Sequence, residues 1–116
     1  MEGGIDMEWH YFTPEQDSVR ALEHLPITEG TELTVIVYPC GVSGNEPIRM
    51  EVNCTWGGLE LPVLAEETFS SLDEAMDLAP LYAKTIQDSK FARPDLNLKT
   101  IMKKLLKLHL DYLQNK

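Results

Sequence analysis

The chain has 116 residues and a net charge of −9, with 43% hydrophobic and 25% charged residues. This length predicts a single domain large enough for one hydrophobic core, and the composition is that of an ordinary soluble globular protein. The apolar runs are too short for a membrane-spanning helix, and the first residues lack both regions of a signal peptide. We therefore expect a cytoplasmic protein without a membrane partner, in which residues 1–6 are disordered or an expression remnant and residues 7–116 form one domain.

The charge is distributed unevenly along the chain. Residues 1–78 contain 16 acidic and 2 basic residues, a net charge of −14, whereas residues 79–116 contain 3 acidic and 8 basic residues, a net charge of +5. Binding to a phosphate backbone needs lysine and arginine, so we expect no direct nucleic-acid binding. An acidic region fits a protein partner with a basic surface, although it can also serve solubility alone.

The N-terminal part predicts a short strand followed by a helix. Residues 7–12 alternate in a way that suits a strand. Thr13, Pro14 and Gln16 have the spacing of an N-cap, a first-turn proline and a capping box. The helix is expected to run to His24 or Leu25, where the proline that follows ends it.

A three-strand meander is predicted between Glu32 and Leu64. Its strands are residues 33–38, 48–56 and 59–64. The first is apolar on both sides, which predicts a central strand. Gly57 and Gly58 form the second turn, and Pro62, which lacks a ladder donor, places the third strand at an edge or ends it early.

Two helices are predicted after the meander. Ser71 and Glu74 form a capping box, and the helical period that follows continues through Pro80, which predicts either one kinked helix or two short helices in line. The last helix is expected from about Asp95 to about Leu113. The fold is therefore predicted to be α+β, a small antiparallel three- to four-stranded sheet with helices packed on one face, in the order (β)αβββαα.

The cysteines and histidines suggest structural roles. With residues 41–47 as the loop, Cys54 lies opposite Thr34, roughly 20 Å along the strand from Cys40, which is too far for a disulfide. Cys54 is therefore expected to be a small core residue, and His109 a buried histidine with one hydrogen bond. No spacing typical of a metal site, cofactor site or catalytic triad occurs, so we expect no cofactor, no metal and no enzymatic activity.

A group of carboxylates near the third strand and the next helix is the first candidate binding surface. We expect the helical members to lie on the solvent-facing side, and together the group could form a negative ridge that imitates nucleic-acid phosphates. The residues are Glu60, Glu66, Glu67, Asp73, Glu74 and Asp77. This interpretation predicts a small non-enzymatic inhibitor, immunity protein or anti-defence protein that docks on a basic, nucleic-acid-binding protein. Complementarity to the helix dipole is the alternative explanation for the acids in the first turn.

The last helix is the second candidate surface. Its apolar arc is wider than one packing seam needs, and Leu106, Leu110 and Leu113 are candidates for self-association. This interpretation predicts a structural or regulatory module that forms a homodimer or another homo-oligomer through its C-terminal amphipathic helix.

Overall fold

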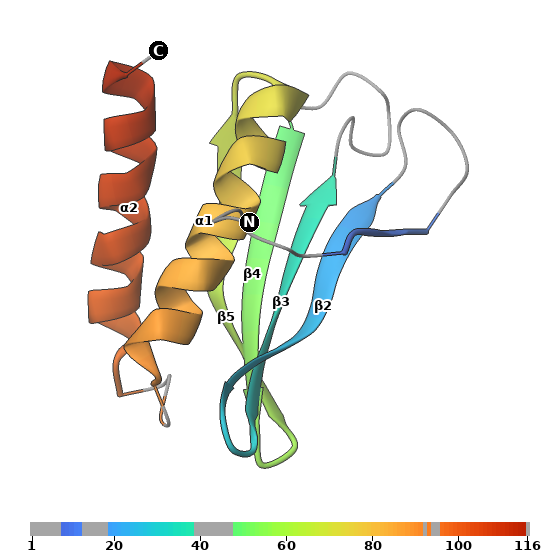
Figure 1. The fold of residues 1–116 in the computed structure, drawn as a ribbon, viewed down its shortest axis with the longest axis vertical. Coiled ribbons are helices and arrows are strands. Elements are labelled where there is room, and N and C mark those ends of the chain that lie inside the picture. Colours follow the sequence, from blue (N-terminus) through green and yellow to red (C-terminus); the bar gives the residue numbers. More distant parts are fainter. Residues whose placement is uncertain (1–7, 13–18, 39–47, 92, 94–95, 116) are drawn as a thin grey trace, which may run out of the picture.

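The computed structural model describes residues 8–12, 19–38, 48–91, 93 and 96–115, and only the backbone of 64–68. The elements are β1 (His10–Tyr11), β2 (Arg20–Thr28), β3 (Thr31–Tyr38), β4 (Ile48–Trp56), β5 (Leu59–Phe69), α1 (Leu72–Ser89) and α2 (Leu98–Gln114) (Figure 1). The strands form one antiparallel sheet in the order β1-β2-β3-β4-β5. The predicted α+β fold is confirmed, with five strands instead of three to four.

The predicted N-terminal helix is wrong from residue 20 onward, because Arg20–Thr28 is the strand β2, paired with β3. Pro26 lies inside this strand and not at a helix end. The strand β1 pairs with Arg20 and Ala21, and among the described strands nothing pairs with the outer side of the Pro26 segment, so this segment is an edge, where a missing N–H is tolerated. The predicted capping residues Thr13, Pro14 and Gln16 lie outside the described residues.

The pairing of β3 and β4 places the buried apolar side chains of both strands on one face. Leu33 pairs with Cys54, and Val35 pairs with Val52; all four side chains are fully buried. The prediction that Cys54 faces Thr34 is therefore wrong by one residue. Opposite residues of antiparallel strands share a face, so a slip of one residue would turn the buried set of one strand to the other side.

The strand β5 begins after the predicted glycine turn. Gly57 and Gly58 have φ values of 56° and 81°, which suits the tight hairpin turn that favours glycine at both positions. The strand β5 lies at the edge of the sheet, as Pro62 predicted, but it continues to Phe69 instead of ending early. The chain therefore leaves the sheet at the end of β5 and continues directly into α1.

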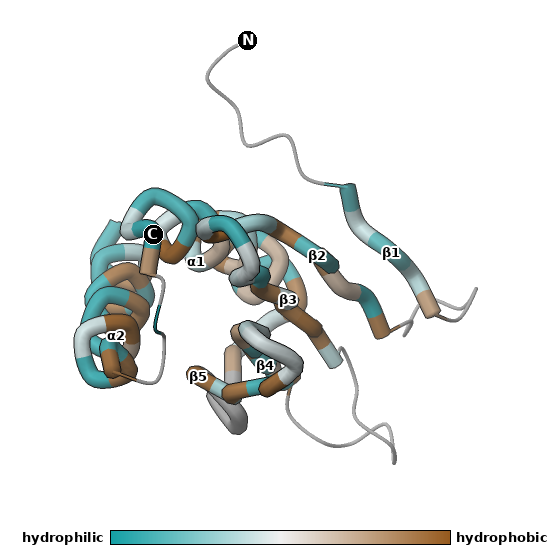
Figure 2. The backbone as a smooth tube through the Cα atoms, turned by 90° about the horizontal axis from the view of Figure 1, so that it is seen from below, coloured by the Kyte–Doolittle hydropathy of each residue, from teal (hydrophilic) through white to brown (hydrophobic). Residues whose placement is uncertain are grey.

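The helix α1 is a single helix that continues through Pro80. Ser71 is its N-cap, and the Ser71 side chain accepts a hydrogen bond from the Glu74 N–H at 3.1 Å, as the capping box predicted. The core lies between this helix and the sheet, and Figure 2 shows both helices on one side of the curved sheet. The buried residues of α1 are Glu74, Ala75, Leu78, Ala79, Tyr82, Ala83 and Ile86.

The helix α2 is attached to the rest of the fold along a narrow strip. It begins at Leu98, after the N-cap residue Asn97, and the predicted start at Asp95 lies outside the described residues. Only Ile101 and Leu105 of this helix are buried. Of the described elements, α2 contacts α1 and β5 alone. Neither described helix is long and apolar enough to cross a bilayer.

Candidate functional site

The predicted carboxylate ridge is divided between the two ends of β5. Glu60 is exposed at the start of this strand, whereas Asp73 and Asp77 are exposed on the first turns of α1, which follows the end of the strand. Nine residue steps separate Glu60 from the last residue of β5, roughly 30 Å of extended chain. The side chains of Glu66 and Glu67 lie outside the described part. The described carboxylates therefore do not form one continuous surface.

Glu74 is a core residue, so the prediction that it lies on the solvent-facing side of the helix is wrong. Its exposed fraction is 2%. Position 74 lies one turn before Leu78, on the side of α1 that faces the core. A buried carboxylate is costly unless it is paired, and a polar residue on α2 supplies the partner.

His109 is that partner, and it links the two helices. Its Nε2 lies 2.6 Å from Glu74 Oε2, and its side chain is 12% exposed. The ring also stacks at a tilt on Phe69, with 4.9 Å between the ring centroids. The predicted hydrogen bond of this histidine is confirmed, and the ring lies at the border of the core, mostly but not fully buried. Because an ionised carboxylate only accepts, Nε2 carries the hydrogen of this bond.

Ser70 completes this cluster, but the arrangement differs from that of a catalytic triad. The Ser70 hydroxyl donates to Glu74 Oε1 at 2.5 Å, so the carboxylate lies between the hydroxyl and the imidazole. A serine nucleophile is activated by a direct hydrogen bond to the base, with the carboxylate behind the base. Here the carboxylate accepts from both groups, which fixes α2 on the first turn of α1.

A row of four exposed apolar side chains runs along α2, and we call it the α2 row. Its members are Met102, Leu106, Leu110 and Leu113, with exposed fractions of 47%, 56%, 50% and 47%. Steps of four, four and three residues place them on one stripe of the helix. Three of the four are the leucines proposed from the sequence for self-association, and the structure adds Met102.

The α2 row lies beside the strip that attaches α2 to the core. Met102 and Leu106 follow the buried residues Ile101 and Leu105, so each is turned by about 100° around the helix axis. His109 lies between the attached strip and the row, and it contacts Phe69 at the end of β5. The row is therefore on the side of α2 that turns away from α1.

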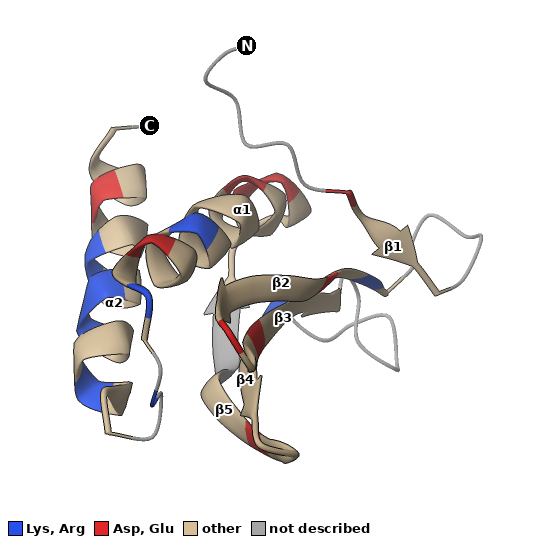
Figure 3. Ribbon diagram, turned by 60° about the horizontal axis from the view of Figure 1, so that its bottom comes forward, with Lys and Arg blue, Asp and Glu red and all other residues tan. Residues whose placement is uncertain are grey.

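Lysines border the α2 row on its outer side. Lys99 and Lys103 are exposed, and within the described part of the chain no carboxylate lies within ion-pair distance of either. Lys107 pairs with Asp111 at 3.3 Å. Figure 3 shows basic residues along α2 and acidic residues at the start of α1. The exposed apolar surface is thus bordered by positive charge, although the whole chain is acidic.

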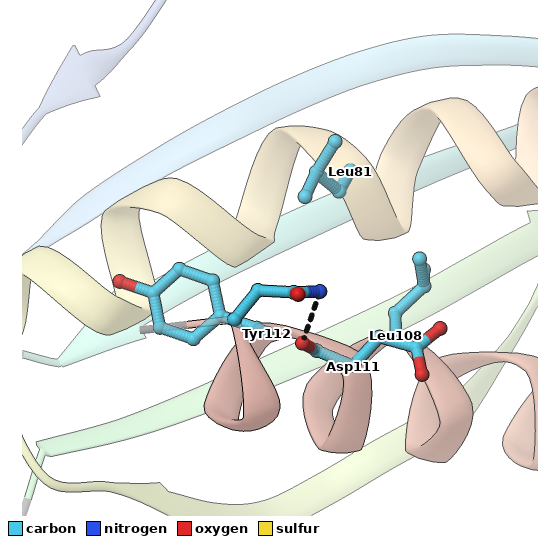
Figure 4. Close-up of a pocket in the computed structure, with 5 residues that line it drawn as sticks. Leu81, Leu108, Asp111 and Tyr112 are labelled. Carbon is cyan, nitrogen blue, oxygen red and sulfur yellow. Dashed lines mark hydrogen bonds between the residues drawn. The ribbon is translucent and has the colours of Figure 1, made fainter.

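A shallow groove of about 320 Å³ lies between α1 and α2, on the side of α2 opposite the row (Figure 4). Its lining residues are Leu81, Leu108, Asp111, Tyr112 and Asn115. At its margin, the Tyr112 hydroxyl donates to Asp77 at 3.0 Å. Partial desolvation, followed by this hydrogen bond and the charge of Asp77, raises the pKa of Tyr112. The groove holds one acidic residue and no basic residue, and it gives no sign of a specific ligand.

Cys54 is a free thiol in the core, as the sequence predicted. Burial raises its pKa to about 11, so the thiol is protonated and a poor nucleophile at neutral pH. Cys40 lies outside the described residues. Among the residues with described positions, no three His, Cys, Asp or Glu side chains are grouped in a way that could hold a metal ion.

No family model, no curated protein and no solved structure matches this chain. Its function must therefore be argued from its own surfaces. The sequence indicated the three leucines of the α2 row, because the apolar arc of the helix is wide. It did not indicate the contact of Glu74 with His109, since only the packing of α2 on α1 brings residues 35 positions apart together.

Proposed function

We propose that this chain is a non-enzymatic protein-binding module whose docking surface is the α2 row. The single observation that carries the proposal is the exposure of four long apolar side chains on one stripe of a regular helix. Contiguous apolar patches on soluble proteins mark interaction sites. An apolar helical stripe with i, i+4 spacing is the surface that one amphipathic helix presents to a groove or to another helix.

A second protein fits this surface better than a second copy of the chain. Each copy carries a net charge of −9, so two copies repel each other at long range. If the two α2 helices paired in an antiparallel way about a two-fold axis, each flank would meet the same flank of the partner. The lysine-bearing flank of one copy would then lie along the lysine-bearing flank of the other copy, which is unfavourable.

The test compares two leucines of similar exposure, one inside the row and one outside it. Leu106 is 56% exposed in the row, and Leu59 is 61% exposed at the start of β5. In pull-downs from the cells that make the protein, Leu106→Gln should lose a partner that wild type and Leu59→Gln both retain. Equal recovery by the two variants would refute docking on the row. Sedimentation of the same proteins would show whether the bound species is a second copy.

The exposed acids at the start of α1 favour a second candidate function, the docking of this chain on a basic protein. Asp73 and Asp77 are exposed on consecutive turns, and this pair supports an inhibitor, immunity or anti-defence role for the chain. Binding would then weaken steeply with salt, and Asp73→Asn would weaken it while Leu106→Gln would not. Under either candidate we place the protein in the cytoplasm, a compartment that suits the buried free thiol of Cys54.

A further inference from the structure

We infer that the α2 row receives an acidic amphipathic helix of a partner protein, with apolar residues on one side and aspartate or glutamate on the borders. This inference rests on the proposed docking function and adds the chemistry of the partner. The net charge of the chain is negative and suggests a basic partner. The lysines that border the row instead favour an acidic partner segment.

Helix geometry places the lysines within reach of anything that covers the row. With a rotation of about 100° per residue, Lys99 lies about 20° from Leu106 around the helix axis, and Lys103 lies about 60° from it. Lys104 lies about 160° away, on the opposite side of the helix. A helix that packs on Leu106 therefore has its flank next to Lys99 and Lys103, but not next to Lys104.

These two lysines favour a partner with negative charge, because no described carboxylate neutralises them. Lys99 and Lys103 lack a carboxylate partner among the described residues. A partner that covers the row removes water from both ammonium groups, which costs free energy unless an opposite charge takes its place. Acidic flanks on the partner provide that charge, whereas basic flanks would add repulsion.

The size and charge of the surface favour a peptide helix over other anionic partners. From Met102 to Leu113 the row extends about 17 Å, roughly three helical turns. Nucleic acid offers phosphates for the lysines but no apolar side for four long side chains. An anionic membrane would have to approach a chain whose net charge is −9, and its negative surface would repel that charge.

The experiment uses the full-length protein and two synthetic helical peptides of 18 residues that share one leucine stripe. One peptide carries glutamate on its borders, and the other carries lysine. We expect the glutamate peptide to bind about tenfold more tightly at low ionic strength, with the difference shrinking in 0.5 M salt as the charges are screened. Fluorescence anisotropy of labelled peptides measures both affinities. Equal affinities, or a preference for the lysine peptide, would overturn the inference.

Two adjacent lysines give a matched pair of variants. Lys103→Glu should abolish or reverse the preference for the glutamate peptide, whereas Lys104→Glu makes the same change of charge on the opposite side and should preserve it. If both variants weaken binding equally, net charge alone explains the preference and the specific border is refuted.

The apolar variant separates failure of the inference from failure of the proposed function. Leu106→Gln should weaken both peptides, and Leu59→Gln should weaken neither. Peptides that bind through Leu106 without any charge preference would refute the acidic partner and leave the docking function intact. If neither peptide binds wild type, both ideas fail. Leu106-dependent binding to anionic lipid vesicles, or a dimer that Leu106→Gln dissolves, would assign the row to a membrane or to a second copy.

Discussion

The two helices have similar lengths but very different environments. Helix α1 has 18 residues, of which seven are buried, and it crosses β2, β3 and β4. Helix α2 has 17 residues, of which two are buried, and among the described elements it contacts α1 and β5 alone. Both have an amphipathic pattern, so the pattern alone does not determine how much of a helix is covered. The position of a helix relative to the sheet determines it.

This difference separates a structural helix from a helix that offers a surface. Helix α1 buries even a carboxylate, Glu74, whereas α2 exposes methionine and leucine. The contact between Glu74 and His109 holds the exposed helix on the buried one.

The largest effect is expected from removal of the histidine that pairs with Glu74. In His109→Leu the buried carboxylate loses its imidazole partner, and removal of one partner of a buried pair costs about 3–5 kcal/mol. We expect the free energy of unfolding, measured by urea titration, to fall by about that amount.

The double variant Glu74→Leu, His109→Leu is the control for this prediction. It replaces the buried polar pair with an apolar pair and should recover most of the lost stability, because no buried carboxylate has lost its imidazole partner. If the single and double variants are equally unstable, loss of packing around position 109 would explain the result and the pairing would be irrelevant.

Two neighbouring positions on α2 give the next largest effect. Ile101 is fully buried and Met102 is 47% exposed. Ile101→Ala should lower the free energy of unfolding by about 2–4 kcal/mol, since it leaves a cavity, whereas Met102→Ala should change it by less than about 0.5 kcal/mol. Similar losses in thermal or urea unfolding at both positions would mean that something covers the row in the isolated protein.

The thiol of Cys54 tests whether the layer below α1 excludes solvent. In a Cys40→Ser variant the remaining thiol reports on Cys54 alone. With a pKa of about 11, its thiolate fraction at pH 8 is about a hundredfold below that of an ordinary cysteine. A colorimetric disulfide reagent should therefore react slowly with the native protein and rapidly in urea. Rapid reaction with the native protein would show that this part of the core opens easily.

The sequence predicted elements well where the pattern and the end signals agreed. The strand at 48–56, the glycine turn and the N-cap at Ser71 are all confirmed. The helix predicted before Pro26 was wrong, since capping signals near residue 13 were extended over residues that pair with β3. Strand pairing is a long-range property, and it overrode the local helical signals.

The candidate site was less predictable, because it depends on what remains uncovered after folding. The wide apolar arc of the last helix indicated Leu106, Leu110 and Leu113, but only the observed packing shows which side of the arc is exposed. Charge was misleading for Glu74, since an acidic residue in a first turn usually faces solvent. Its burial depends on His109, which no local pattern connects to it.

The smallest effect is expected at the second contact between the helices. The Tyr112 hydroxyl donates to Asp77 at 3.0 Å at an exposed position, whereas Glu74 and His109 meet in the interior. Exposed hydrogen bonds contribute little net stability, so Tyr112→Phe should destabilise the protein much less than His109→Leu in the same urea titration.

The pH dependence gives this contact its own signature. The pKa of Tyr112 is raised in the folded protein, so above pH 10 the unfolded chain loses this proton before the folded chain does. The unfolded state then binds fewer protons, and stability falls as pH rises through this window. Tyr112→Phe should reduce that decline, while leaving stability below pH 9 nearly unchanged. An identical alkaline decline in the variant would show that the hydrogen bond of Tyr112 to Asp77 contributes nothing to holding α2 on α1.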